Sequence, residues 1–110
     1  MALSGAKFNS GGASGTVAVT LASLIGSRKQ YRWINFSAPS NTGSVTISMT
    51  STAGGGAGTL YSFPATTVKD WTIGPSLNNT PAGEAFTLDP ATIFIKGGAV
   101  GDVVHISYIT

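Results

Sequence analysis

Short stretches in which apolar and polar residues alternate run through most of this 110-residue chain. In the clearest of them, Val45, Ile47 and Met49 alternate with serine and threonine. A period of two places successive side chains on opposite faces of a strand, so this stretch predicts a strand with one buried face. No stretch carries the 3.6-residue period of a helix, apart from a turn expected at residues 22–25. The alternation therefore restricts the chain to all-β folds.

Turn-forming residues separate these stretches at intervals of about ten residues, as in the run of proline, serine, asparagine and glycine at residues 39–43. Strands are expected within residues 16–21, 29–37, 44–49, 60–63, 68–73, 84–88, 92–96 and 102–109. Seven or eight short strands at this spacing predict an antiparallel β-sandwich of the jelly-roll kind.

The first fifteen residues contain four glycines and lack a hydrophobic period. We therefore expect residues 1–15 to form a flexible N-terminal arm and residues 16–110 to form a single β-sandwich domain. Leu3 and Phe8 would give such an arm two apolar anchors on a neighbouring molecule. The alternative is an ordinary frayed terminus.

Charged residues make up 9% of the chain and the net charge is +2, while 42% of the residues are hydrophobic. This composition favours a packed core over disorder. One histidine makes a Ser-His-Asp triad formally possible, but the chain has no G-x-S-x-G motif to position the nucleophile. Each of the four carboxylates neighbours a turn or a predicted strand end, where local hydrogen bonding or edge protection is a more ordinary use than a glycosidase pair. One histidine without cysteine argues against a zinc site. We expect no enzyme, no metal and no cofactor, and we expect His105 to be a structural strand residue. No run approaches the roughly 20 apolar residues of a membrane span, so we expect no membrane contact.

The last two predicted strands differ from the others because they carry apolar residues on both faces. In residues 102–109 the apolar residues occupy both alternating positions, and Phe94 lies opposite two isoleucines. Either these strands are central and covered by loops, or their outer faces meet another subunit. The small size, low charge and lack of disulfides favour the second interpretation. We expect a homo-oligomer, with Phe94, Ile106 and Tyr108 as candidate contacts.

Two alternative functions depend on the aromatic residues. Four of them would form a sugar-stacking surface if they lay together: Tyr31, Trp33, Tyr61 and Trp71. Such a surface would make the chain a carbohydrate-binding module, although large aromatics in small β domains more often lie in the core. Residues 28–33 interleave bases with aromatics, as platforms for single-stranded nucleic acid do. A net charge of +2 makes nucleic-acid binding the third choice.

The C-terminal half has a recognisable order of motifs. A loop and strand with the sequence PAGEAFTL at 81–88 precede a strand at 93–96 and the turn and strand GGAVGDVV at 97–104, after an upstream strand RWINF at 32–36. In this order, residues 28–110 resemble the small virion proteins of tailed bacteriophages that decorate or cement capsids. The resemblance implies a β-sandwich subunit, commonly trimeric, seated on the lattice of the major capsid protein. We therefore expect a non-enzymatic decoration protein, made in the host cytoplasm and located on the capsid surface of the virion.

Overall fold

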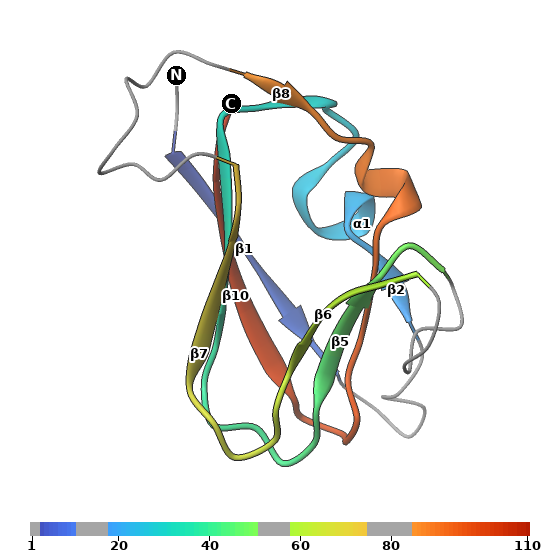
Figure 1. The fold of residues 1–110 in the computed structure, drawn as a ribbon, viewed down its shortest axis with the longest axis vertical. Coiled ribbons are helices and arrows are strands. Elements are labelled where there is room, and N and C mark those ends of the chain that lie inside the picture. The colour runs from blue at the N-terminus through green and yellow to red at the C-terminus, as the bar shows by residue number, and fades with distance from the viewer. Residues whose placement is uncertain (1–2, 11–17, 51–57, 75–84) are drawn as a thin grey trace.

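The computed structural model is a sandwich of two four-stranded sheets and describes residues 3–10, 18–50, 58–74 and 85–110 (Figure 1). Sheet A has the strand order β1 (Leu3–Asn9), β10 (Val103–Ile109), β4 (Trp33–Ala38) and β7 (Lys69–Ile73). Sheet B has the order β2 (Val19–Thr20), β9 (Phe94–Lys96), β5 (Val45–Ser48) and β6 (Thr59–Phe63). A small third sheet pairs β3 (Gln30–Tyr31) with β8 (Phe86–Thr87). The pairings between these strands are antiparallel, which confirms the predicted all-β sandwich.

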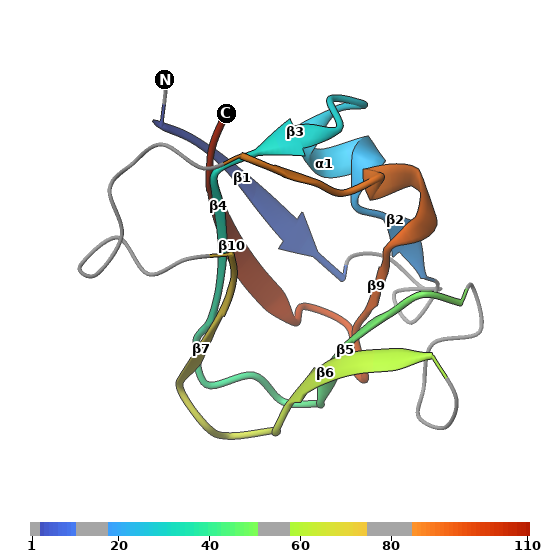
Figure 2. The same ribbon diagram turned by 45° about the horizontal axis from the view of Figure 1, so that its top comes forward.

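Helical structure among the described residues is limited to two short elements. The helix α1 (Ala22–Ile25) is the turn that the sequence predicts, and a 3₁₀ turn, η1 (Pro90–Thr92), follows β8. Asp89 caps η1, because its carboxylate accepts a hydrogen bond from the N–H of Ala91 at 3.0 Å. Figure 2 shows α1 and β3 together at the end of the molecule where both termini lie.

The described residues form ten strands instead of the seven or eight expected from the sequence. One extra strand arises because the expected strand at 29–37 is interrupted at Arg32. The N–H of Arg32 donates to the carbonyl of Ile109 at 2.7 Å, and the chain passes there from β3 into β4. The other extra strand is β1, in a region expected to be flexible.

Strand β1 corrects the expectation of a flexible arm for residues 3–9. These residues pair antiparallel with β10, from Leu3 opposite Ile109 to Asn9 opposite Val103, and Phe8 is 2% exposed in the core. Of the rest of the expected arm, Ser10 is described, whereas residues 1–2 and 11–15 lie outside the described residues. The sequence conceals the strand because Phe8 is the one large side chain on its inward face, whose other positions hold serine and alanine. The pairing with β10, and not a hydrophobic period, makes this segment a strand.

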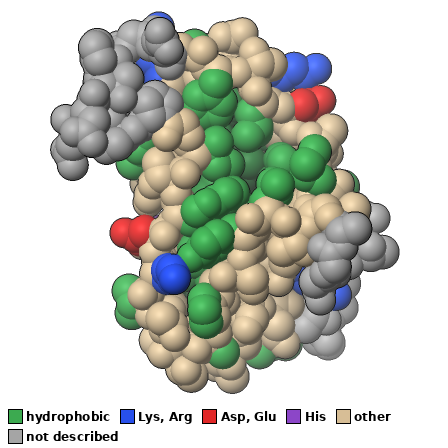
Figure 3. Space-filling model, viewed as in Figure 1, with side chains coloured by type: hydrophobic (Ala, Val, Ile, Leu, Met, Phe, Trp, Pro, Cys, Tyr) green, Lys and Arg blue, Asp and Glu red, His purple; other side chains and the backbone are tan. Residues whose placement is uncertain are grey.

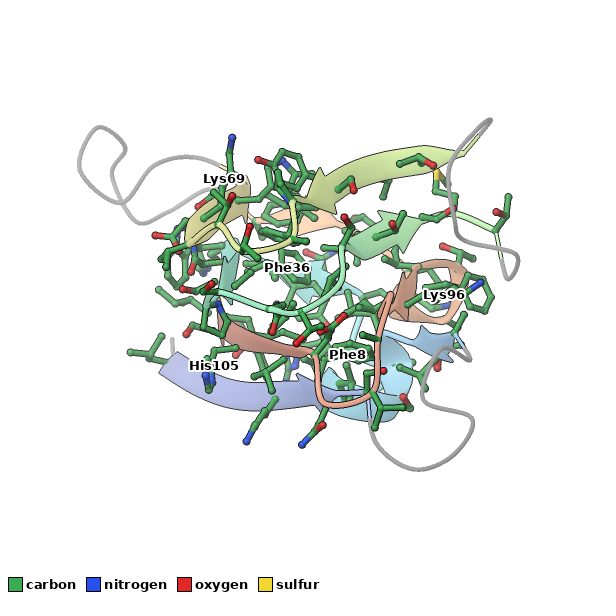
Figure 4. All side chains as sticks on the ribbon, turned by 90° about the horizontal axis from the view of Figure 1, so that it is seen from below. Phe8, Phe36, Lys69, Lys96 and His105 are labelled. Carbon is green, nitrogen blue, oxygen red and sulfur yellow. The ribbon has the colours of Figure 1, made fainter. Side chains whose placement is uncertain are left out.

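Alternate side chains of both sheets point into the space between them, as the period of two requires. In β4 every second residue is buried, and both Phe8 and Phe36 point between the layers (Figure 4). Sheet B contributes Val45 and Ile47, which are fully buried. The core therefore forms along the whole β10–β4 centre of sheet A and the β9–β5 centre of sheet B.

Candidate functional site

Titratable side chains do not gather into a site in the part of the chain that the structure describes. No group of three or more histidines and carboxylates there is close enough to hold a metal ion. His105 is exposed on the outer face of sheet A, between Lys7 of β1 and Ser37 of β4, and Asp70 of β7 lies beyond Ser37 (Figure 4). In a catalytic triad the histidine stands between the serine and the acid. Here Ser37 lies between His105 and Asp70, so these three residues do not have the arrangement of a catalytic triad.

The buried carboxylate of Asp102 has a structural set of partners. It accepts backbone hydrogen bonds from Gly43 at 3.1 Å, Gly98 at 3.0 Å and Ala99 at 2.9 Å. Asp102 is 1% exposed, and these three bonds satisfy a charge that would otherwise be costly to bury. They join the loop between β4 and β5 to the loop between β9 and β10. The glycine-rich run at 97–104, which carries part of the phage resemblance, thus has a structural role: it packs the turn before β10 against the loop between β4 and β5.

A second polar side chain closes the same end of the sandwich. The amide of Asn41 donates from Nδ2 to the carbonyl of Val103 at 2.9 Å and accepts at Oδ1 from the N–H of Val103 at 2.8 Å. The side chain of Asn41 therefore replaces a strand partner at the start of β10. We call the region around Asp102, Asn41, Gly43 and Gly98 the closed end; it lies at the bottom of Figure 1.

The strongest candidate for a functional site is an apolar groove between the two sheets. It has a volume of about 430 Å³, within the range of about 300–1,000 Å³ typical of ligand pockets. Its apolar lining consists of Met49, Leu60, Trp71, Ile73, Leu88 and Ile93. Figure 3 shows hydrophobic side chains in a continuous band down this face of the molecule. We call this feature the groove.

The groove exists because two edge strands border it. Among the described residues, β7 is the last strand of sheet A and β6 is the last strand of sheet B, so neither sheet continues across the opening there. Inward-facing aromatic residues support it from within. Phe36 and Tyr61 both stack on Trp71, with ring centroids 5.5 Å and 5.2 Å from it, and Phe63 packs edge-on against Tyr61. At the mouth, Met49 is 54% exposed and Leu60 is 39% exposed.

The polar groups of the groove lining already have partners within the chain. The Asp89 carboxylate accepts from Ala91 and lies 3.8 Å from the ammonium of Lys29. The hydroxyl of Thr92 donates to the carbonyl of Asp89 at 2.8 Å, and the hydroxyl of Thr87 accepts from Gln30 at 3.3 Å. The groove therefore presents an apolar surface whose polar groups are engaged.

The contact residues expected from the sequence do not form one surface. Phe8 and Ile106 are core residues, 2% and 1% exposed, so their assignment as outward contacts is wrong. Tyr108 faces inward and packs edge-on against Tyr31, with ring centroids 6.0 Å apart. Leu3 is 71% exposed on β1, whereas Phe94 is half-buried on the outer face of sheet B. The strand β10 is central in its sheet, as in the first of the two explanations for its doubly apolar pattern, but strands and not loops flank its outer face at Ile109.

Outward-facing Ile109 completes that explanation. It is 8% exposed because it lies directly between Leu3 on β1 and Trp33 on β4. Neighbouring strands thus cover the outer apolar side chain at this position of β10.

The aromatic residues proposed as a sugar-stacking surface are also separated. Tyr31 is fully buried, and Trp71 and Tyr61 stack on each other at the groove. Trp33 lies on the outer face of sheet A, away from the groove. Because Tyr31 is buried, it is not available to stack on a nucleic-acid base, so the basic and aromatic segment 28–33 has one exposed ring fewer than its sequence suggests.

Sequence reasoning missed the groove. Two of its residues, Trp71 and Ile73, alternate in a predicted strand, which indicates a buried face but not an edge position. The available signal is the pair of short strands on either side of Pro64, because a strand with proline close by is more often an edge strand.

No protein-family model, curated protein or solved structure matches this chain. Among the described residues, no helix is long and apolar enough to span a membrane.

Proposed function

We propose that this chain is a non-enzymatic assembly protein that decorates the capsid surface of a virion by binding the lattice of its major capsid protein. The observation that carries the proposal is the groove, because an exposed concave apolar surface on a small sandwich favours contact with an apolar surface of another molecule. The phage resemblance of residues 28–110 supports the specific form of the proposal. The scarcity of titratable groups makes binding a better fit than catalysis.

The proposed mechanism is addition of buried area across the seams of the shell. Fully burying an exposed leucine contributes about 1.5–3 kcal/mol before the costs of association, and Leu60, which is 39% exposed, would gain the corresponding part of this. A trimer seated where capsid subunits meet would repeat this contact three times. Expanding or rupturing the shell would then require breaking these extra contacts as well. Trimer formation is part of the proposal and is measured separately, by size-exclusion chromatography with light scattering.

The test compares two charge substitutions on exposed apolar residues. Leu60→Lys introduces an ammonium at the mouth of the groove, whereas Val68→Lys makes a similar change at a residue that is 73% exposed and does not line it. Each variant is mixed with undecorated capsids of the same virus, and the bound fraction is measured after sedimentation. We expect Leu60→Lys to lose occupancy at least tenfold and Val68→Lys to retain it. Unchanged occupancy in both variants, or no binding by the parent chain, contradicts the proposal.

Carbohydrate binding is the second candidate, favoured by one observation on the outer face of sheet A. Trp33 is half-buried there, and two residues along β4 the amide of Asn35 donates to the hydroxyl of Thr72 at 2.9 Å. Ser107 lies directly opposite Asn35. An aromatic ring beside amide and hydroxyl groups suits a neutral sugar. Tryptophan fluorescence titrated with a panel of neutral oligosaccharides tests it: saturable quenching that Trp33→Ala abolishes supports this function, and no quenching by any of them removes it.

A further inference from the structure

We infer that the groove accepts an extended apolar peptide segment of a partner protein, which adds as a strand to the edge of β7 that has no strand partner among the described residues. This inference rests on the proposed function, since it specifies how the groove makes its protein contact. It is carried by three features: the strand edges that border the groove, the engaged polar groups of its lining, and the spacing of apolar residues along it.

The first feature is the backbone of the edge strands. One side of β7 pairs with β4, and one side of β6 pairs with β5. On their other sides neither has a strand partner among the described residues. A free strand edge presents a row of N–H and C=O groups, and another extended backbone satisfies such a row. The groove thus joins an apolar lining to a template for main-chain hydrogen bonds.

The second feature excludes a polar small molecule as the best occupant. The carboxylate of Asp89 and the hydroxyls of Thr87 and Thr92 already have the partners described above. A saccharide in the groove would place its own hydroxyls against apolar side chains, which is unfavourable without replacement hydrogen bonds. Apolar side chains entering the groove incur no such penalty.

The third feature is length. The five residues of β7 extend over roughly 17 Å at the rise of a strand. In an added strand every second side chain points to the same face, so two or three side chains of the incoming segment would enter the groove. The flexible thioether of Met49 at the mouth can adapt to different apolar side chains.

A second copy of β7 is a poor occupant. If two β7 strands paired antiparallel about Trp71, Lys69 of each copy would lie opposite Ile73 of the other, and Asp70 opposite Thr72. Lys69 shares the inward side of β7 with Trp71 and Ile73 in the alternation of the strand. This register brings a lysine against the apolar mouth and offers it no acid. A partner segment with apolar residues at alternate positions avoids this conflict.

The probe is a soluble synthetic peptide in which threonine alternates with isoleucine and valine over seven residues, with a lysine at each end. Two further peptides carry N-methyl groups on one or the other alternate set of backbone amides. In an added strand one set of amides faces β7 and the other faces away. We expect saturable binding of the parent peptide by calorimetry, a loss of at least tenfold with one N-methylated peptide, and little change with the other. Leu60→Lys should lose binding and Val68→Lys should keep it.

Three results would overturn the inference: no binding of the parent peptide, equal binding of both N-methylated peptides, or a concentration-dependent dimer that competes with the peptide for the groove. Failure of this inference is distinguishable from failure of the proposed function. If Leu60→Lys abolishes capsid occupancy but no peptide binds, the decoration proposal stands and strand addition is wrong. If the peptide binds as expected but the chain does not occupy capsids, strand addition stands and decoration is wrong.

Discussion

The closed end and the groove differ in the polarity and burial of their side chains. At the closed end, polar groups are buried and fully engaged: the carboxylate of Asp102 accepts three backbone hydrogen bonds, and the amide of Asn41 makes two with Val103. At the groove, apolar side chains such as Leu60 remain partly exposed beside two strand edges that have no strand partner in the described part of the chain.

We infer from this contrast that the closed end stabilises the fold and that the groove is the surface available for binding. A polar network whose members are all satisfied rigidifies the loops that it joins and leaves nothing for a ligand to satisfy. Exposed apolar area, by contrast, represents stabilisation that the isolated chain has not gained and that a partner can supply. Substitutions at the closed end should therefore change stability, whereas substitutions at the mouth of the groove should change binding.

The largest expected effect is at the centre of the closed end. Asp102→Ala removes the buried acceptor of three hydrogen bonds and leaves three backbone N–H groups without it, so we expect the free energy of unfolding to fall by about 3 kcal/mol. Urea unfolding monitored by tryptophan fluorescence measures this change. Asp70→Ala, at an exposed position of β7, is the matched control and should change stability by less than about 0.5 kcal/mol. Equal losses in the two variants would show that the Asp102 network does not stabilise this end.

A smaller loss of stability is expected when a closely packed glycine of the closed end is substituted. A Cβ atom at Gly98 would lie 2.8 Å from the carbonyl oxygen of Ser44 and 2.9 Å from its nitrogen, so the backbone must shift. We expect Gly98→Ala to destabilise the chain by about 1–3 kcal/mol, as overpacking does. At Gly5 the nearest atom, the carbonyl oxygen of Ile106, is 3.6 Å away, and Gly5→Ala should be tolerated. Thermal unfolding of both variants tests the difference; a similar Tm for the two would contradict the tight packing of the closed end.

The smallest effect concerns a buried polar group that differs from Asp102 in having no partner. The hydroxyl of Tyr31 is buried without a hydrogen bond among the described residues, and burial, with a smaller contribution from Tyr108, raises the pKa of this phenol. At neutral pH we expect Tyr31→Phe to stabilise the chain by at most about 1 kcal/mol, since it removes an unsatisfied group.

The same tyrosine gives stability a dependence on alkaline pH. A tyrosine in the unfolded chain ionises near pH 10, but Tyr31 in the folded chain keeps its proton to higher pH. Stability from this group is thus complete below about pH 10 and is lost as the pH rises toward the folded pKa. Urea unfolding at pH 8 and pH 10.5 should show a smaller loss in Tyr31→Phe than in the parent chain. Identical losses would mean that the folded environment does not perturb Tyr31.

The alternation of apolar and polar residues was sufficient to predict the all-β sandwich, the turn at α1 and the approximate positions of nine of the ten strands, with β3 and β4 expected as one. These features depend on residues close in the chain, where the period of side chains and the conformational preferences of glycine and proline act directly.

Tertiary structure decided which faces are inside and which strands are edges. Phe8 and Ile106 were expected to be contacts but are core residues, because β1 near the start of the sequence pairs with β10 near its end. The groove likewise requires β6 and β7 to end their respective sheets, with Tyr61 stacked on Trp71 between them. A period of two tells which side chains share a face, but it contains no information on which face a distant strand will cover, because that choice depends on the burial of the whole core at once.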